Sequence, residues 1–585
     1  MGKKQLRLCQ LTTPFESDGA NAWEVYPRPQ MRRVSYQSLC SLWQLTVIRG
    51  KNREKLGGIQ VPFPPESRIS GIFRQMAPGE QYRYERTFHL QEPVQDGRIL
   101  LHFGAVDQYA RVFLNGQAVG EHTGGYLPFT LDVTTVVTEG ENALAVEVED
   151  PLDTELPYGK QRRDRGGMWY TPISGIWQPV WLERVPKNYV RSLRLTPGLD
   201  HVVVETEGGT AEKCLTLHLL EGERQYCYTG DTTVIHVEEP ILWTPENPHL
   251  YYFTLQAGED VIESYFALRT ITVEARGDRS YICLNGEPLF LHGLLDQGYY
   301  SDGIYLPASP EGYRWDILTM KRLGFNLLRK HIKIEPDLFY YYCDLYGMIV
   351  WQDMVNAGAY SFLIDTALPT LGIKRGVEHK PSPRRRKYFE SSAWETVELL
   401  YNHPCVCCYT IFNEGWGQYE GGRLYRELKA LDSSRIWDTA SGWFTEEESD
   451  VTSEHVYFRR LRFKARPDRP LVLSEFGGYS CKIPGHAFNL DKTYGYKNFE
   501  DLPSFQAGLE RLYREEVMAA IAEGLCAAIL TQVSDVEDET NGLVTYDRRV
   551  VKVGEGSMAA LAADLHAVFS RRISEERWES IGGFL

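Results

Sequence analysis

The stretch that most constrains the fold is a run of eight almost wholly apolar residues, 405–412, bounded by Pro404 and Gly415. A short apolar run between proline and glycine is typical of a strand buried on both faces, as in a parallel sheet. Asn413 and Glu414 follow at its carboxyl end, which is where α/β barrels and open α/β sheets keep their chemical groups. The run therefore predicts a parallel α/β domain with a polar site at its strand ends.

A second run of the same shape, residues 470–474, is followed by Glu475. Two buried strands that each lead into a glutamate predict a pair of facing carboxylates. Hydrolysis of a glycosidic bond with retention needs a proton donor and a carboxylate nucleophile about 5–5.5 Å apart, and neighbouring barrel strands can set that separation. A single glutamate at such a place is equally well explained as a structural acid at a helix N-terminus. The presence of two favours the catalytic interpretation.

The pattern along the chain predicts four segments. Residues 1–25 are expected to form an N-terminal arm. Short alternating strands separated by Gly, Pro and Asn turns over 26–185 predict a jelly-roll β-sandwich. A second, shorter all-β pattern over 186–275 predicts an immunoglobulin-like β-sandwich. Helical periods and apolar strands then alternate over 276–585, which predicts a C-terminal (β/α)₈ TIM barrel.

One insertion interrupts the barrel pattern at residues 357–386 and ends in a run rich in proline and arginine. Because it follows a barrel strand, we expect it to be a long loop on the catalytic face. A solvated basic loop and a loop that contacts substrate are both consistent with this composition.

Composition excludes several classes of partner and site. The 63 basic and 79 acidic residues give a formal charge of −16, so we expect no nucleic-acid partner. No run of 18 apolar residues occurs, so no membrane span is expected. The N-terminus lacks the apolar core of a signal peptide, which predicts a cytoplasmic protein unless a leader was removed. The 11 scattered Cys favour reduced thiols over a disulfide framework or a zinc site.

Several ordered motifs resemble glycoside hydrolase family 2, the family of β-galactosidases, β-glucuronidases and β-mannosidases. The resemblance covers nearly the whole chain and implies the same three domains. The motifs that carry it, besides the two glutamate runs, are residues 61–67, 112–117, 124–129, 169–177, 242–251, 324–331 and 343–348.

The resemblance implies roles for individual residues. Glu414 matches the family's acid/base, Glu475 its nucleophile, Asn413 a contact to the sugar 2-hydroxyl and Tyr457 the tyrosine that hydrogen-bonds the nucleophile. The remaining residues expected to border the sugar are His331, Arg329, Asp296, Trp351, Gln352, Asp353 and Trp416. Taken alone, His331 fits a core histidine, and Trp416 fits packing as well as stacking.

The substrate is less constrained than the reaction. The β-glucuronidases carry an Asn-x-Lys clamp late in the barrel, and the corresponding residues 539–542 contain no cation. A uronate is therefore disfavoured, unless basic residues of the insertion bind it. We expect a retaining exo-β-glycosidase whose first-choice substrate is a β-galactoside, with β-glucuronide, β-mannoside or β-arabinofuranoside as alternatives. The chemistry requires no cofactor. The sequence predicts no metal-binding residues and leaves open whether a metal ion assists.

Two further questions stay open from the sequence. A non-catalytic carbohydrate-binding protein is the alternative of another class, but such a relative is expected to have lost one of the two glutamates. Homo-oligomers are common among enzymes of this kind, so an assembly of identical chains is an open expectation beside the carbohydrate partner.

Overall fold

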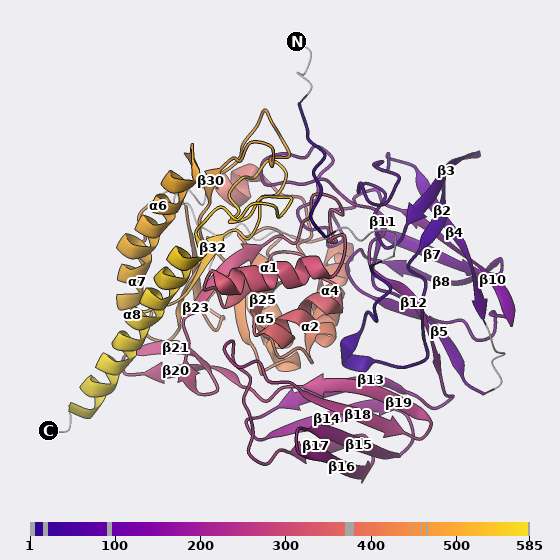
Figure 1. Cartoon of the computed structure of the whole chain (residues 1–585), viewed down its shortest axis with the longest axis horizontal. Helices are drawn as coiled ribbons and strands as arrows, with labels where there is room; N and C mark the ends of the chain where they lie inside the picture. The colour runs from indigo at the N-terminus through magenta and orange to yellow at the C-terminus, as the bar shows by residue number, and fades with distance from the viewer. Residues whose placement is uncertain are drawn as a thin grey trace.

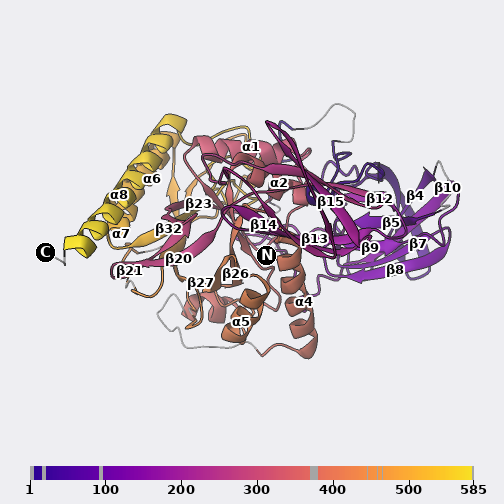
Figure 2. The same ribbon diagram turned by 90° about the horizontal axis from the view of Figure 1, so that it is seen from below.

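The structure is a computed structural model, and it describes residues 6–15, 22–90, 96–368, 380–444, 446–457, 459–463 and 466–582. Parts of the expected arm (1–5 and 16–21) and of the insertion (369–379) lie outside these described residues. The N-terminal sandwich and the C-terminal helix lie at opposite ends of the molecule, with the barrel between them (Figures 1 and 2).

The N-terminal domain is a β-sandwich of two antiparallel sheets. The larger sheet has the order β3-β2-β4-β10-β7-β8 and the smaller one the order β1-β12-β5-β9. Alternate residues of both sheets form one buried apolar cluster, as expected for two sheets packed face to face. The strands are β1 (Tyr36–Ser38), β2 (Leu42–Arg49), β3 (Asn52–Gln60), β4 (Gln81–Leu90), β5 (Arg98–Phe103), β7 (Tyr109–Leu114), β8 (Gln117–Thr123), β9 (Phe129–Asp132), β10 (Gly140–Glu149) and β12 (Val180–Val185).

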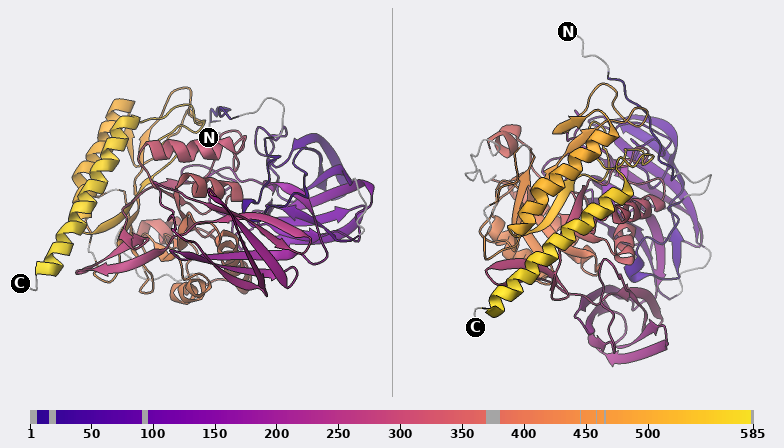
Figure 3. Two further views of the ribbon diagram at one scale, coloured as in Figure 1. Left: turned by 60° about the horizontal axis from the view of Figure 1, so that its bottom comes forward. Right: turned by 60° about the vertical axis from the view of Figure 1, so that its left-hand side comes forward.

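The second domain is a smaller sandwich, which lies below the barrel in Figure 1 and forms a separate rounded unit in the right panel of Figure 3. Its sheets have the orders β13-β14-β17 and β16-β15-β18-β19, and they share a second apolar cluster. The strands are β13 (Val190–Pro197), β14 (His201–Gly208), β15 (Glu212–Leu219), β16 (Gly222–Thr229), β17 (Thr232–His236), β18 (Tyr251–Ala257) and β19 (Asp260–Phe266).

This domain corrects one expectation drawn from the cysteines. Cys214 and Cys227 are joined in a disulfide, whereas their scattered positions had favoured reduced thiols throughout. The two residues are direct partners in the antiparallel pairing of β15 with β16, which places their side chains next to each other. Nine other cysteines of the described chain are free. The disulfide therefore depends on the register of the hairpin formed by β15 and β16, which the spacing of the cysteines in the sequence does not reveal.

The third domain is the predicted barrel. Its eight-stranded sheet has the order β27-β26-β25-β24-β23-β32-β29-β28, and all of its pairs are parallel. The Ser453 hydroxyl of β28 reaches Asp438 of β27 at 2.7 Å and so links the two end strands. The strands are β23 (Leu291–Asp296), β24 (Leu327–Lys330), β25 (Ile349–Asp353), β26 (Val406–Asn413), β27 (Ile436–Ser441), β28 (Thr452–Val456), β29 (Leu471–Gly477) and β32 (Leu525–Thr531).

Helices cover the outside of the barrel (Figure 1). They are α1 (Glu311–Arg322), α2 (Asp337–Tyr346), α4 (Pro383–Leu400), α5 (Gly421–Leu431), α6 (Leu502–Leu512), α7 (Met518–Ala522) and α8 (Glu555–Gly582). The multidomain fold class predicted from the sequence, two β-sandwiches followed by a (β/α)₈ barrel, is confirmed.

The insertion differs from the expected continuous loop. Its Phe362–Ala367 segment forms a π-helix, and α4 already begins at Pro383. The Ser382 hydroxyl accepts a hydrogen bond from the Arg385 amide at 3.0 Å and caps the helix. A serine followed by proline is a strong helix-start signal, so the arginine-rich end of the insertion belongs to a helix.

The described part of the N-terminal arm lies on the barrel. Arg7 forms an ion pair with Asp491 at 2.8 Å, and the Thr13 hydroxyl donates to Asp302 at 2.7 Å. Within the described residues, none of the helices combines the length and the apolar character needed to cross a bilayer.

Candidate active site

Strand β26 delivers Glu414 to the carboxyl end of the barrel. All eight of its residues are buried, as the apolar run predicted. Glu414 follows directly with a φ of +52°, a left-handed conformation that costs a non-glycine residue about 1–3 kcal/mol. Its amide donates to the Ser441 carbonyl at 3.0 Å, and its carboxylate is hydrogen-bonded to His455 Nδ1 at 2.8 Å. The neighbouring strands thus hold the strained turn that aims Glu414.

Glu475 lies on β29 in a buried, positively polarised environment. The Arg329 guanidinium donates to its Oε1 at 3.2 Å, and the Tyr457 hydroxyl donates to its Oε2. Burial by itself raises the pKa of Glu475, but the charges of His455 and Arg329 outweigh burial and lower the pKa to about 2. Glu475 is therefore an ionised carboxylate at neutral pH.

The two glutamates, placed 61 positions apart in the chain, face each other. One carboxylate oxygen of Glu414, one of Glu475 and a nitrogen of His455 all lie within 4.8 Å of one another. The carboxyl groups of retaining glycosidases are separated by about 5–5.5 Å, whereas inverting enzymes leave about 6.5–9.5 Å for a water molecule. The short separation corresponds to the first class.

Arg329 connects the ends of several barrel strands. Its Nε donates to Asp353 at 3.0 Å, and its Nη2 donates to Asn413 and to the Ser441 hydroxyl, both at 2.9 Å. The side chain is fully buried, and a buried charge is tolerated when it is paired and hydrogen-bonded. Arg329 therefore fixes Asn413 and Glu475 in one rigid arrangement.

His331 has one ring nitrogen bound and one free for a ligand. Its Nδ1 donates to Asp353 at 2.7 Å, while its buried Nε2 has no hydrogen-bond partner among the described residues. Burial lowers the pKa of His331 well below its ordinary value, so the ring is neutral and Nε2 is an acceptor. Buried polar atoms normally find a partner, which makes a ligand hydroxyl the natural one for this atom.

Two aromatic residues expected at the site have different surroundings. The Tyr457 ring stacks on Tyr496 with 4.1 Å between ring centroids, and its hydroxyl also contacts Thr531 at 3.0 Å. Trp416 is only 3% exposed, and its ring contacts Trp169 edge-on at 5.2 Å. Tyr457 thus joins the catalytic group, whereas Trp416 belongs to an aromatic cluster beside it.

The three expected residues of β25 divide between the two faces of the strand. Side chains alternate along a strand, so Trp351 and Asp353 share one face and Gln352 has the other. The Trp351 indole donates to Thr410 at 2.8 Å. Gln352 instead accepts from the Tyr340 hydroxyl of α2 at 2.7 Å. The structure does not bring Gln352 to the catalytic group.

Asp296 is likewise outside the group. It is the register partner of Lys330, and the Lys330 ammonium donates to it at 2.6 Å. Its other oxygen accepts from the Gly298 amide at 2.9 Å. Lys330 also pairs with Glu335 at 2.9 Å. The structure therefore places Asp296 in a buried ion-pair network rather than beside Glu414 and Glu475.

Two residues that sequence reasoning missed lie near the catalytic pair. His455, on β28, bonds Glu414 and approaches Glu475 at 3.6 Å. Its position two residues before Tyr457, which directly follows β28, was the available signal. Glu539 accepts from Gln532 at 2.6 Å, and burial raises the pKa of Glu539 to about 7.

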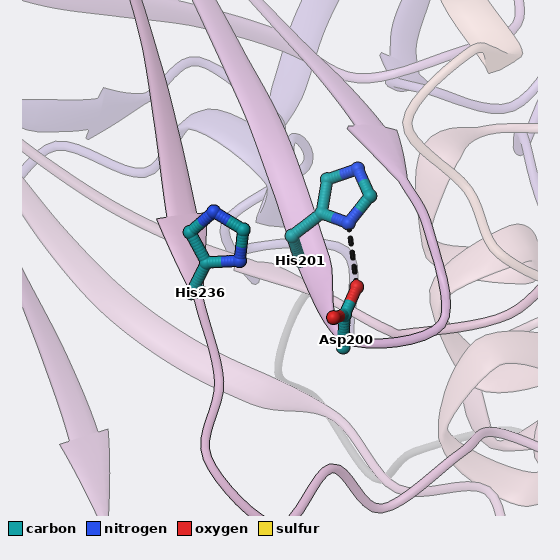
Figure 4. A group of neighbouring side chains, drawn as sticks. All are labelled: Asp200, His201 and His236. Carbon is teal, nitrogen blue, oxygen red and sulfur yellow. Dashed lines mark hydrogen bonds and ion pairs between the residues drawn. The ribbon is translucent and has the colours of Figure 1, made fainter.

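Two groups of described residues have donor sets that could hold a metal ion. One is the catalytic group itself, where the Arg329 cation at 3.2 Å from Glu475 opposes a second cation. The other lies in the second sandwich, where His201 and His236 face each other across β14 and β17. Figure 4 shows these rings with Asp200, whose carboxylate bonds His201 at 2.7 Å. This set suits Zn²⁺ and stands apart from the barrel.

Two family models match the chain. "Glycosyl hydrolases family 2, sugar binding domain" matches residues 61–186, and "Glycosyl hydrolases family 2, TIM barrel domain" matches residues 277–548. They cover the first sandwich and the barrel that carries the catalytic group.

Known proteins are similar over the same domains. A β-galactosidase of Thermoanaerobacter pseudethanolicus is 26% identical in an alignment of 469 residues that covers 72% of this chain and 59% of that protein. A putative β-glucuronidase of Formosa agariphila is 27% identical in an alignment of 337 residues that covers 54% of this chain and 37% of that protein. The alignments thus span at most 59% of these two curated relatives.

Solved structures share the architecture. The β-D-glucuronidase of Dictyoglomus thermophilum superposes with a TM-score of 0.74 at 18% identity, covering 92% of this chain and 98% of that one. The family 2 β-galacturonidase of Eisenbergiella tayi gives 0.67 at 20% identity, covering 92% and 99%. At such identities the likeness shows the fold. Because both family models match in order and together span most of the chain, the protein belongs to glycoside hydrolase family 2.

Proposed function

We propose that this protein is a retaining exo-β-glycosidase that releases terminal β-linked sugars by double displacement. The observation that carries the proposal is the carboxylate pair, with oxygens of Glu414 and Glu475 within 4.8 Å of each other. That separation suits direct attack by one carboxylate on the anomeric carbon. Family membership and the β-glycosidase names of the relatives agree with this chemistry.

In the first step, Glu475 attacks the anomeric carbon while Glu414 protonates the leaving oxygen. The environment of Glu475, whose pKa is lowered to about 2, keeps the nucleophile ionised. The Tyr457 hydroxyl and Arg329 guanidinium hold its two oxygens in place. A covalent glycosyl-enzyme forms, and the aglycone leaves with the proton.

In the second step, Glu414 takes a proton from water, and the water attacks the anomeric carbon and frees Glu475. His455, bonded to Glu414 at 2.8 Å, keeps the acid/base oriented through both steps. Asn413, fixed by Arg329, is the proposed contact to the sugar 2-hydroxyl. Neither step requires a cofactor, because general acid/base and nucleophilic catalysis use only the two carboxylates.

For the sugar, we propose a β-galactoside. The most similar sequence relatives include several named β-galactosidase, and residues 539–542 contain no cation to bind a uronate. Structural relatives named β-glucuronidase and β-galacturonidase keep β-uronides as the second candidate. A purely carbohydrate-binding role would not require both glutamates in this paired geometry.

The test is a panel of chromogenic aryl β-glycosides with two variants. Glu475→Gln is expected to lose turnover on every substrate, because an amide cannot act as the nucleophile. Glu414→Ala is expected to keep activity on an activated leaving group when azide is added, with β-glycosyl azide as the product. Near-normal rates for Glu475→Gln, or no azide product from Glu414→Ala, would remove these roles.

A further inference from the structure

A loop of the N-terminal sandwich reaches into the barrel beside the catalytic group. Tyr158 donates from its amide to the Asn356 carbonyl at 3.1 Å and from its hydroxyl to the Gly358 carbonyl at 3.0 Å. At the next residue, Gly159, a Cβ would lie 3.1 Å from the Ile332 carbonyl. The backbone of this loop therefore touches the residue that directly follows His331.

The other side of the loop is anchored to the segment after β32. The Tyr170 amide donates to the Lys160 carbonyl at 3.0 Å, and the Thr171 amide donates to Glu537 at 2.9 Å. Arg165 also pairs with Glu537 at 3.2 Å. Lys160 is thus held between the end of β24 on one side and the residues that surround Glu539 on the other.

Lys160 differs from the other buried or half-buried cations around the barrel mouth. Its ammonium makes neither a hydrogen bond nor an ion pair with any residue that the structure describes, and its carbonyl accepts from the Tyr170 amide. Those other cations are each engaged by a carboxylate: Arg165, Arg329, Lys330, Lys333, Arg548 and Lys552. A lysine fixed by its backbone with an unengaged ammonium is available to a ligand.

The charge of Lys160 is felt by three barrel residues of the site. Burial is the main influence on the pKa of His331, Glu475 and Glu539, and the Lys160 charge lowers the pKa of all three. These residues come from three different strand ends. The Lys160 charge therefore lies within electrostatic reach of the catalytic group, as the contacts of its loop with the ends of the barrel strands require.

A surface cavity of about 330 Å³ opens along the same loop. Its walls include Tyr158 and Gln161, which flank Lys160, and Trp169, whose ring packs on Trp416. The loop thus borders open space next to the segment that carries Glu414.

We propose that Lys160, supplied by the N-terminal sandwich, is a sugar-binding residue of the barrel's active site, and that it and Glu539 bind neighbouring hydroxyls of a neutral sugar. The inference rests on the proposed glycosidase function and deepens it. A fixed ammonium donates to sugar oxygens and a nearby carboxylate accepts from sugar hydroxyls, so the pair suits vicinal hydroxyls. The active site then spans two domains.

The charge balance favours a neutral ligand over a uronate. Lys160 is within electrostatic reach of two carboxylates, Glu475 and Glu539, and its positive charge lowers the pKa of both. A substrate carboxylate would add a further negative charge, and like charges at short range are unfavourable. Lys160 is therefore expected to bind a sugar hydroxyl rather than a substrate carboxylate.

The experiment compares wild-type protein, Lys160→Met and the matched control Lys55→Met, an exposed lysine of the same domain. On the neutral aryl β-glycoside that wild type cleaves fastest, Lys160→Met should lower kcat/KM by roughly 10- to 100-fold, as expected for a lost hydrogen bond from a charged donor. The control should retain the wild-type value. Thermal unfolding of each variant checks that the fold is intact.

Monodeoxy analogues of that substrate separate binding from a structural effect. The decrease in kcat/KM caused by Lys160→Met, relative to wild type, should be at least several-fold smaller on the analogue that lacks the hydroxyl bound by Lys160. On the other analogues the decrease should be as large as on the parent substrate. Equal losses on every analogue, or an unchanged kcat/KM on the parent, overturn the role of Lys160 while the glycosidase proposal stands.

Aryl β-glucuronide and β-galacturonide complete the panel. A wild-type preference for either uronide that disappears in Lys160→Met overturns hydroxyl recognition and makes Lys160 an anion clamp. A wild-type protein inactive on every glycoside refutes the proposed function and this inference with it.

Discussion

Removal of one hydroxyl, in Tyr457→Phe, probes the nucleophile without disturbing the core. The tyrosine hydroxyl donates to Glu475 Oε2 and contacts Thr531 at 3.0 Å, while its ring stays stacked on Tyr496. A hydrogen bond to a charged group contributes about 1.5–3 kcal/mol, and each 1.36 kcal/mol changes a rate tenfold. We therefore expect kcat to fall by roughly 10- to 100-fold.

The loss should fall mainly on the second chemical step. Negative charge returns to Glu475 as the glycosyl-enzyme breaks down, and the missing hydroxyl no longer stabilises that charge. A burst of released aglycone, followed by slow turnover, is the expected stopped-flow signature. Since the hydroxyl also favours the ionised form, its removal raises the pKa of Glu475 above its value of about 2 and moves the acid limb of kcat/KM upward.

The matched control is Tyr252→Phe, a half-exposed tyrosine on the second sandwich. It should leave kcat, the burst and the pH profile unchanged. If Tyr457→Phe keeps kcat within twofold of wild type and shows no burst, the hydroxyl does not support the nucleophile and the description of this contact is wrong.

Three further outcomes follow from the structure. The pKa of Glu475 is lowered from 4.5 to about 2, so its ionised form contributes up to about 3 kcal/mol to stability above pH 4.5, and this contribution is lost as the pH falls toward 2. Calorimetry should show that Glu475→Gln flattens the dependence of stability on pH between these values. An unchanged dependence contradicts the shift. Cys214→Ser removes the disulfide to Cys227, a residue 13 positions later in the chain. Denaturant unfolding should show that the second sandwich is destabilised by about 2–3 kcal/mol. Equal stability of variant and wild type would exclude the disulfide. Gln352→Ala should leave kcat/KM within threefold but lower the thermal midpoint, because its partner is Tyr340 of a covering helix; a large loss of kcat/KM at unchanged stability would instead place it at the sugar.

The sequence was sufficient for the strands that carry the chemistry. The apolar run before Glu414 and the shorter run before Glu475 are buried on both faces, a pattern that few structures other than a parallel sheet satisfy. Their facing carboxylates follow from closure of the barrel. The fold class and the candidate pair could therefore be predicted before any coordinates were known.

Within the barrel, the sequence did not predict the direction in which individual side chains point. Asp296 and Gln352 were expected to border the sugar and do lie at the carboxyl ends of β23 and β25. The alternation of side chains, however, turns them toward Lys330 and Tyr340. The end of a strand determines where a residue lies along the sheet, whereas the alternation of side chains determines which face of the sheet the residue points to. His455 precedes Tyr457 by two residues, and residues two apart in an extended segment point to the same face. The expected position of Tyr457 would therefore have placed His455 on the catalytic face.

Contacts between domains were beyond sequence patterns. Lys160 lies in a loop of the first sandwich, more than 150 positions before any barrel residue that it influences. Local periodicity carries information about neighbours in the chain and none about which loop meets which strand end. The disulfide of Cys214 and Cys227 was missed for the same reason, because it depends on hairpin register.

The central claim is that Glu475 attacks the sugar with Glu414 as its partner. It is tested most directly by incubating the protein with an activated 2-deoxy-2-fluoro β-galactoside, which slows breakdown of a covalent intermediate. Peptide mass spectrometry is expected to find one 2-fluoroglycosyl group, on Glu475. A label on another residue would contradict this assignment, and so would inverted product configuration in the NMR spectrum of an unmodified substrate.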